Sequence, residues 1–356
     1  MKITVNRALL LVLGSSYVVI AILRREAYSP DLVDWNTISI LAALVVVNTG
    51  LMFSGGLDFI AYNIMKITST RRQLLFVSIG LTSFLAMFLT NDVALIVLIP
   101  ITLSIGKFSG KNVDDVIIFQ AMAANVGSML MPFGNPQNII MFREFHLGFS
   151  QFVFFMLPIF SVSIVVLLLF SLIIRNEGIG QTTSVKKPNF LFFSIFLAIL
   201  AMVIIAMLTG QSPYLFLFLI SLSLIFLFLL EPSALIRVDY VLIAVFILIF
   251  LVMNSVREMV SFSPGNNPLT IFFFSLLLSQ FISNVPTTVL FGKVSSWTAL
   301  SYGVNVGGNG TVIASLANII ALRNLSGKNF FRFNKLSFMF LAVTAAFTVL
   351  LLLLHW

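Results

Sequence analysis

Continuous apolar runs of the length that crosses a lipid bilayer dominate this sequence of 356 residues. Leu, Ile, Val and Phe fill windows of about 20 residues, which as an α-helix span about 30 Å of hydrocarbon. Only 9% of the residues are charged, whereas a soluble globular domain has about 25%. A transmembrane β-barrel would show segments of about ten residues with alternating polarity instead. The runs therefore predict an all-α polytopic membrane protein embedded in a lipid bilayer.

Nine runs are predicted to cross the membrane, and two more are interrupted by polar residues. The expected crossings are 8–23, 37–54, 115–138, 151–174, 190–208, 213–230, 239–256, 299–322 and 336–354. The interrupted runs, 73–106 and 269–292, are predicted to be re-entrant helical hairpins. The arm from Leu269 to Ile282 would be about 21 Å long as a helix, too short to cross comfortably, whereas the longer arms of 73–106 leave a double crossing open. The segment 55–70 is expected to lie at the membrane interface.

The basic residues predict the orientation of the chain. The net charge is +8, and its distribution over the loops indicates a topology signal, so no nucleic-acid partner is expected. The segment 175–189 contains Arg175, Lys186 and Lys187, whereas the loop from Gly210 to Pro213 is uncharged. The positive-inside rule then places 175–189 and the N-terminus in the cytoplasm, with the protein in the cytoplasmic (inner) membrane.

Two segments of the chain share a frame of polar residues. NVGSMLMPFGNPQNIIMFR from Asn125 to Arg143 matches NVGGNGTVIASLANIIALR from Asn305 to Arg323 at an offset of 180 residues. Matched Asn, Gly and Arg positions are hard to obtain from apolar composition alone. By the charge distribution, the leading helices of the two halves point in opposite directions, so we expect inverted-topology repeats. The expected parts are an N-terminal helix and loop (1–36), repeat 1 (37–174), a linker with two helices (175–238) and repeat 2 (239–356).

Four polar interruptions at membrane depth are candidate ion-binding elements. They lie at 90–92, 132–138, 283–286 and 307–311. Each combines Gly, Pro or Asn with hydroxyl or amide side chains, which form helices poorly and offer oxygen ligands. Non-helical backbone at this depth is tolerated only where it is buried in protein or lines a cavity, and transporters built from inverted repeats place their sites at such breaks. Oxygen ligands suit Na⁺, and helix N-termini suit anions.

The predicted site has substrate ligands and cation or proton ligands. The substrate ligands are Asn91, Pro136, Asn284, Pro286 and Thr287. The cation or proton ligands, which would also hold Na⁺, are Thr90, Asn91, Asp92, Gly134, Asn135, Ser283, Asn284, Gly308, Asn309 and Thr311. Burying Asp92 costs at least about 3 kcal/mol, and either an ion site or a helix cap explains it. With no Cys and no paired carboxylates or His expected in lipid, no catalytic residue, cofactor or enzyme activity is predicted.

These motifs resemble the ion transporter superfamily that groups divalent anion/sodium symporters, citrate transporters, arsenite permeases and a class of Na⁺/H⁺ antiporters. The resemblance covers about 37–354 and is carried by TNDVALIVLIPITL from Thr90, GNPQN from Gly134, SNVPTTVL from Ser283 and GGNGTVIASLANII from Gly307. It implies two hairpin tips and two unwound helices that bind Na⁺ and an anion, in a domain that slides across the membrane within a homodimer. Thr90, Asn91, Ser283 and Asn284 would take these roles. Asp92 and Val285 stand where the symporters keep Thr, and the motifs are closer to the arsenite-permease branch.

The leading hypothesis is a secondary active transporter of a small anion or oxyanion, either carboxylate-like (as citrate) or arsenite-like, with Na⁺ or H⁺ as the coupling ion. A Na⁺/H⁺ antiporter that uses Asp92 is the alternative, and a passive anion channel is a remote one. The matching position in the second half is Val285. Any carboxylate chemistry is therefore expected to be asymmetric between the halves.

Overall fold

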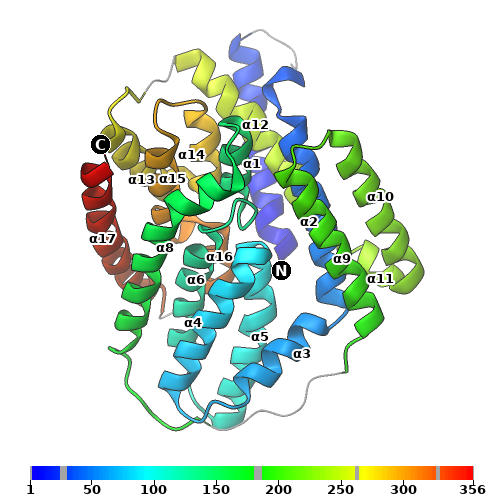
Figure 1. The fold of residues 1–356 in the computed structure, drawn as a ribbon, viewed down its shortest axis with the longest axis vertical. Helices are drawn as coiled ribbons and strands as arrows, with labels where there is room; N and C mark the ends of the chain where they lie inside the picture. The colour runs from blue at the N-terminus through cyan, green and yellow to red at the C-terminus, as the bar shows by residue number, and fades with distance from the viewer. Residues whose placement is uncertain (1, 25–29, 180–186, 261–263, 326–328, 356) are drawn as a thin grey trace. The chain divides into compact units, whose positions relative to one another are not determined.

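The computed structural model describes residues 2–24, 30–179, 187–260, 264–325 and 329–355 (Figure 1). Within these ranges the chain is all-helical, and its extended contacts are limited to one isolated antiparallel bridge between Thr70 and Gly178. The all-α prediction is therefore confirmed. Lys186, which helped to predict the orientation, lies outside the described residues.

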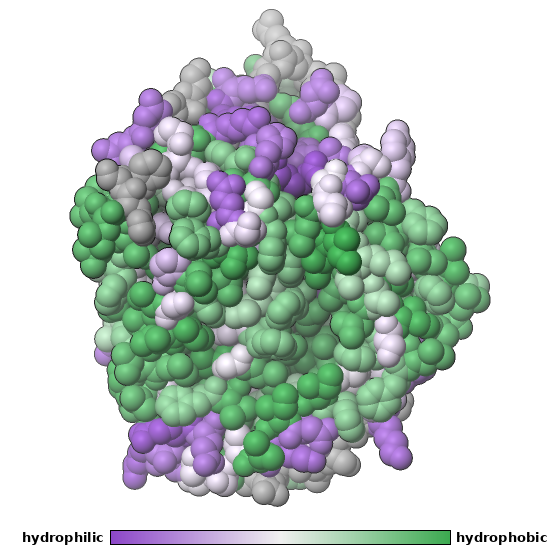
Figure 2. Space-filling view, viewed as in Figure 1, coloured by the Kyte–Doolittle hydropathy of each residue, from purple (hydrophilic) through white to green (hydrophobic). Residues whose placement is uncertain are grey.

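Seven helices of the described chain are long and apolar enough to cross a membrane. They are Trp35–Phe53, Asn91–Ser109, Phe149–Ser171, Phe190–Leu208, Pro213–Leu230, Pro232–Val260 and Phe330–Leu354. Of the nine predicted crossings, 8–23 forms a shorter apolar helix, Arg7–Leu23. The crossings 115–138 and 299–322 are each divided into two short helices, because the polar motif inside each run ends one helix before the next begins. Figure 2 shows apolar side chains over most of the visible face.

The chain divides into two compact units. Unit 1 consists of Met1–Gly56, Pro188–Ser263 and Val289–Gly292. Its helices are α1 (Lys2–Arg24), η1 (Pro30–Leu32), α2 (Trp35–Phe53), α9 (Phe190–Leu208), α10 (Pro213–Leu230), α11 (Pro232–Leu235) and α12 (Tyr240–Val260). Within this unit, α1 packs on α12, and α2 packs on α9 and α10. Gly50 allows the close approach of α2 and α9, because a Cβ there would lie 2.1 Å from the ring of Phe196.

Unit 2 consists of Leu57–Lys187, Pro264–Thr288 and Lys293–Trp356, and it takes in segments of both predicted repeats. From the first repeat come α3 (Gly56–Met65), α4 (Arg71–Phe88), α5 (Asn91–Ser109), α6 (Asp114–Ser128), α7 (Pro136–Glu144) and α8 (Phe149–Ser171). From the second come α13 (Pro268–Ile282), α14 (Asn284–Phe291), α15 (Trp297–Val306), η2 (Val312–Ala314), α16 (Leu316–Leu322) and α17 (Phe330–His355). The last residues of α14 belong to unit 1. The tightest pairs are α4 with α6 and α13 with α15.

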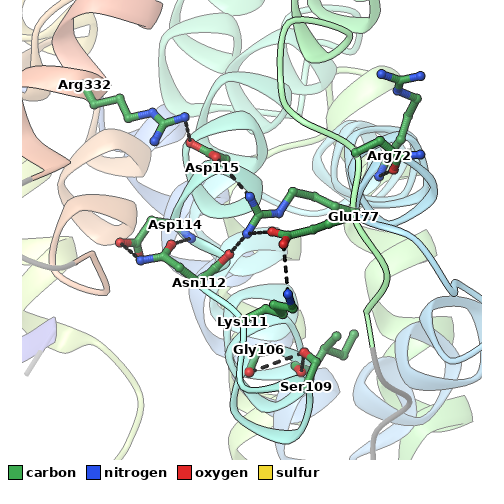
Figure 3. Close-up of polar contacts among 12 residues, drawn as sticks. Arg72, Gly106, Ser109, Lys111, Asn112, Asp114, Asp115, Glu177 and Arg332 are labelled. Atoms are coloured by element: carbon green, nitrogen blue, oxygen red, sulfur yellow. Dashed lines mark hydrogen bonds and ion pairs between the residues drawn. The ribbon is translucent and has the colours of Figure 1, made fainter.

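Charged side chains join four segments of unit 2 at the start of α6 (Figure 3). Arg332 Nη2 lies 2.7 Å from Asp115 Oδ1, and Arg71 Nη1 lies 3.8 Å from Asp115 Oδ2. Glu177, which follows α8, is 2.9 Å from Arg71 Nη2 and 3.0 Å from Lys111 Nζ. This charged cluster has three basic and three acidic members: Arg71, Lys111, Arg332, Asp114, Asp115 and Glu177. It ties the first turns of α4, α6 and α17 together at one end of unit 2.

Candidate functional site

The two hairpin tips are short interruptions between successive helices of the chain. Thr90 separates α4 from α5, and Ser283 separates α13 from α14. Ser283 has φ of 75°, a left-handed conformation that is uncommon for a residue with a side chain. Its hydroxyl donates to the carbonyl of Ala314 at 3.2 Å, in the break between α15 and α16. At the first tip, the backbone N–H of Asn91 donates to the carbonyl of Gly134 at 3.2 Å. Each tip is therefore held against the broken helix of its own half.

The first helix break lies between α6 and α7 and is capped by its own asparagines. Asn135 precedes Pro136 at the start of α7, and its side chain accepts from the backbone N–H of Asn138 at 2.9 Å. The Asn138 amide in turn donates to the carbonyls of Ser128 at 3.1 Å and Met131 at 3.1 Å. The backbone N–H and C=O groups that a helix break leaves unpaired are thus hydrogen-bonded within the protein. This is required in the membrane interior, where no water can pair with them.

The second break, between α15 and α16, repeats this arrangement 180 residues later. Asn318, the counterpart of Asn138, donates to the carbonyls of Gly308 at 2.9 Å and Thr311 at 2.9 Å. A further support comes from Gln280 on α13, which donates to the carbonyl of Gly307 at 2.7 Å and accepts from the backbone N–H of Thr311 at 2.9 Å. Offset-related residues therefore make matching contacts in the two breaks.

The asparagines of the NVG frame reach across to the break of the other half. Asn125 Nδ2 donates to Asn318 Oδ1 at 2.9 Å, and Asn305 Nδ2 donates to Asn138 Oδ1 at 2.8 Å. Two more bonds follow the same exchange: Ser315 Oγ donates to Asn125 Oδ1 at 2.9 Å, and Asn135 Nδ2 donates to Asn305 Oδ1 at 3.0 Å. The bonds of Asn125 accompany the packing of α16 beside α6 (Figure 1), and those of Asn305 accompany the contact of α15 with α7. The two breaks therefore fix each other's backbone.

Asn309, inside the GGNGT segment of the second break, has a fully buried side chain whose polar atoms are unused. Its exposed fraction is 0%, and neither Oδ1 nor Nδ2 has a hydrogen-bond partner among the described residues. Leaving a buried amide unsatisfied costs about 1–3 kcal/mol. Native proteins rarely accept such a cost away from functional positions. Asn309 is therefore the described side chain of the breaks best suited to meet a ligand.

The polar groups around the tips and breaks are almost all neutral. The hydrogen bonds described above join asparagine, glutamine and serine side chains with one another and with backbone groups. Asp92, in the first turn of α5, is the ionisable residue of the predicted site, and only 7% of its surface is exposed. Four helices also begin at these elements: α5 at Asn91, α7 at Pro136, α14 at Asn284 and α16 at Leu316. Their N-termini contribute partial positive charge.

All of the predicted site residues fall in unit 2, and the structure brings most of them into contact. Asn91 lies at Gly134 in the first break, and Asn284 Nδ2 would lie 3.1 Å from a Cβ at Gly308 in the second. Pro136 and Pro286 lie in the first turns of α7 and α14. The hydroxyl of Thr287 donates back to the carbonyl of Ser283 at 2.8 Å.

A comparison with known protein families decides what kind of protein this is. The family model described as citrate transporter (CitMHS) matches residues 3–298. The chain belongs to the citrate transporter family. The prediction of a membrane transporter rather than an enzyme is therefore confirmed, and so is the resemblance of its motifs to this group.

Individual relatives of this citrate transporter family member agree with that assignment. The chain is 34% identical to an uncharacterized transporter of Methanocaldococcus jannaschii, covering 83% of this chain and 82% of that one. It is 31% identical to the inner membrane protein YbiR of Escherichia coli, covering 83% and 81%. A putative transporter of Dictyostelium discoideum, arsB, is 29% identical over 38% of this chain and 23% of its own length.

Several polar residues at the centre of this citrate transporter family member were not among the predicted site residues. They are Asn125, Ser128, Asn138, Gln280, Asn305, Ser315 and Asn318. Six of them belong to the matched segments 125–143 and 305–323, so the repeat itself was the signal that could have identified them. Gln280 has no such signal, because nothing local distinguishes a buried Gln on α13 that contacts a break 27 residues away.

Proposed function

We propose that this protein is a secondary active transporter of a small anion or oxyanion, citrate-like or arsenite-like, driven by a Na⁺ or H⁺ gradient. The observation that carries the proposal is Asn309 in the second break, whose buried amide has no hydrogen-bond partner among the described residues. An amide can donate to a carboxylate or oxyanion and can also ligate a cation through its oxygen.

The charge of the site supports coupling to a cation. The hydrogen bonds described above join neutral side chains and backbone groups, and Asp92 adds negative charge when it is ionised. Helix N-termini offset only part of the charge of a bound anion. An anion taken from water into such a site therefore needs a cation or proton beside it. This requirement favours symport over passive flow of the anion alone.

The division of the chain supports an elevator-type mechanism. Unit 2 contains both tips, both breaks and every predicted site residue, whereas unit 1 contains none of them. A domain that carries its complete site can alternate access by moving as one body, as the opposed repeats of such transporters imply. We further propose a homodimer in the cytoplasmic membrane with a cytoplasmic N-terminus. The relative YbiR, an inner membrane protein, supports that location.

A Na⁺/H⁺ antiporter is the second candidate, because Asp92 is a nearly buried carboxyl beside Asn91 in the first tip. Such a carboxyl can exchange a proton for a cation without an organic substrate. Replacement of Asp92 by Asn would then abolish Na⁺-driven proton movement, whereas a symporter of oxyanions would still carry its anion with altered ion dependence.

Proteoliposome uptake tests the proposal. Purified protein is reconstituted and offered dicarboxylates, citrate, arsenite, sulfate and phosphate, each with and without inward Na⁺ and H⁺ gradients. We expect gradient-dependent accumulation of one member of the panel, reduced at least about tenfold in Asn91→Ala and Asn284→Ala. Uptake of every compound at the rate of empty vesicles, or a current that persists without any ion gradient dependence, would contradict the proposal.

A further inference from the structure

Asn125 stands between the two hairpin tips. Its Oδ1 lies 3.4 Å from Nδ2 of Asn91, the asparagine of the first tip. Its Nδ2 donates to the carbonyl of Gly308 at 3.0 Å, in the break next to the second tip. One buried side chain, 3% exposed, thus contacts the first tip with its oxygen and the second break with its nitrogen.

Gly308 completes the connection to the second tip. A Cβ built on Gly308 would lie 3.1 Å from Asn284 Nδ2 and 3.7 Å from Asn125 Cγ. The same residue is therefore in contact range of the second-tip asparagine and of Asn125. The next residue is Asn309, whose amide has no partner among the described residues. The contacts therefore run from Asn91 of the first tip through Asn125 and Gly308 to Asn284 of the second tip.

The counterpart of Asn125 in the other half does not make this connection. Asn305 Oδ1 accepts from Asn135 at 3.0 Å and Gln137 at 3.5 Å, and its Nδ2 donates to Asn138 at 2.8 Å and to the carbonyl of Ser301 at 2.9 Å. All of these partners belong to the first break or to α15 itself. Among the described residues, the side chain of Asn305 therefore fixes a break without a hydrogen bond to either tip.

We propose that Asn125 is a positioning residue that couples ligand occupancy at one hairpin tip to ligand affinity at the other. The inference rests on the proposed function, because it requires that the tips bind the cation and the substrate. A ligand that orders Asn91 fixes the orientation of the Asn125 amide, and that amide holds the Gly308 carbonyl beside Asn284 and Asn309. Such coupling is reciprocal, and between sites it typically amounts to about 5–150-fold in affinity.

Equilibrium binding to the full-length protein in lipid nanodiscs tests the coupling. The dissociation constant of Na⁺ is measured with and without saturating citrate or arsenite, whichever the wild type carries, and the reciprocal titration is done with the anion. For a proton-driven wild type, pH replaces Na⁺. Asn125→Ala is expected to bind each ligand alone but to lose most of the coupling factor, by about fivefold or more. Asn305→Ala, the matched control, is expected to keep the wild-type factor.

Two results would overturn the inference: Asn125→Ala keeps the wild-type coupling factor, or Asn305→Ala loses it to the same extent. The second result would mean that coupling between the tips requires only that the two helix breaks are rigid, and that the path through Asn125 has no special role. Gly308→Ala provides an independent route if Asn125→Ala does not fold, because its methyl group would displace the Asn284 amide by a few tenths of an ångström. Retained coupling in that variant would contradict the path as well. A wild type that binds none of the tested anions would refute the proposed function itself.

Discussion

The guanidinium of Arg332 lies 2.7 Å from the carboxylate of Asp115 and so joins the first turn of α17 to the first turn of α6 (Figure 3). The Asp115 side chain is 7% exposed and that of Arg332 is 50% exposed. Removing the partner of a buried carboxylate leaves its charge poorly compensated. Because α6 leads directly to Asn125 and the first break, this ion pair anchors the base of the proposed site.

Arg332→Gln is expected to lower the free energy of unfolding by about 1–2 kcal/mol, a value discounted for the exposure of the arginine. Lys335→Gln is the matched control, because Lys335 lies on the same helix, is exposed and has no ion pair among the described residues. The midpoint of thermal unfolding in detergent checks both variants. Equal shifts in the two would show that net charge alone matters here.

The pKa of Glu177 makes the contribution of the charged cluster to folding stability depend on pH. The hydrogen bond from Lys111, followed by the charge of Arg71, holds the pKa of this carboxyl below its ordinary value of 4.5. A carboxyl whose pKa is lower in the folded state stabilises the fold above the unfolded pKa, and this stabilisation is lost as pH falls through the folded pKa. We therefore expect the stability difference between wild type and Glu177→Gln to be constant at neutral pH and to disappear as the pH drops below about 4. Unfolding midpoints measured across a pH series check this.

The local signals in the sequence predicted the interruptions of the helices well. Thr90 and Ser283 do separate the arms of the two hairpins, and the PFGNPQN and GGNGT segments do divide two of the predicted crossings. Each prediction depended on residues within a few positions of one another, such as Asn135 before Pro136, where capping and proline geometry act locally.

The partners of these interruptions could not be predicted in the same way. Asn125 and Asn305 were recognised as repeat markers, but their bonds join residues 193 and 167 positions apart. The charged cluster brings together Arg71, Asp115 and Arg332 from three helices, and a single sequence gives no information on which distant charges meet. The count of nine crossings stays a prediction, because two of the nine runs are divided into short helices, and how a divided run lies in the membrane depends on tertiary packing.

Gly127 lets α4 approach α6 closely. A Cβ at this position would lie 2.2 Å from the backbone oxygen of Ser83, and backbone atoms cannot move aside as a flexible side chain can. Gly127→Ala is therefore expected to destabilise the protein by about 1–3 kcal/mol. Gly80→Ala on α4 is the control, since a Cβ there has no atom within 4 Å and alanine favours the helix by about 0.5–1 kcal/mol. Thermal unfolding of the two variants should shift in opposite directions.

Asn309 and Asn318 both belong to the second break region, yet their replacement by alanine should affect the stability of the protein very differently. Asn318 donates to the carbonyls of Gly308 and Thr311, so Asn318→Ala orphans buried carbonyls and is expected to cost about 3 kcal/mol of stability. Asn309 makes no side-chain hydrogen bond among the described residues. The free energy of unfolding of Asn309→Ala should therefore lie within about 1 kcal/mol of the wild-type value.

If the buried amide of Asn309 contacts the ligand, Asn309→Ala should lose more transport activity than Asn318→Ala. Uptake per folded molecule is then expected to fall at least about tenfold in Asn309→Ala, although this variant is the more stable of the two. Folded protein is quantified by size-exclusion chromatography, and uptake by the proteoliposome assay in the same preparation. Wild-type uptake by Asn309→Ala would show that its unsatisfied amide is a packing defect rather than a ligand, because a residue that binds the transported ion or substrate cannot be removed without changing its affinity.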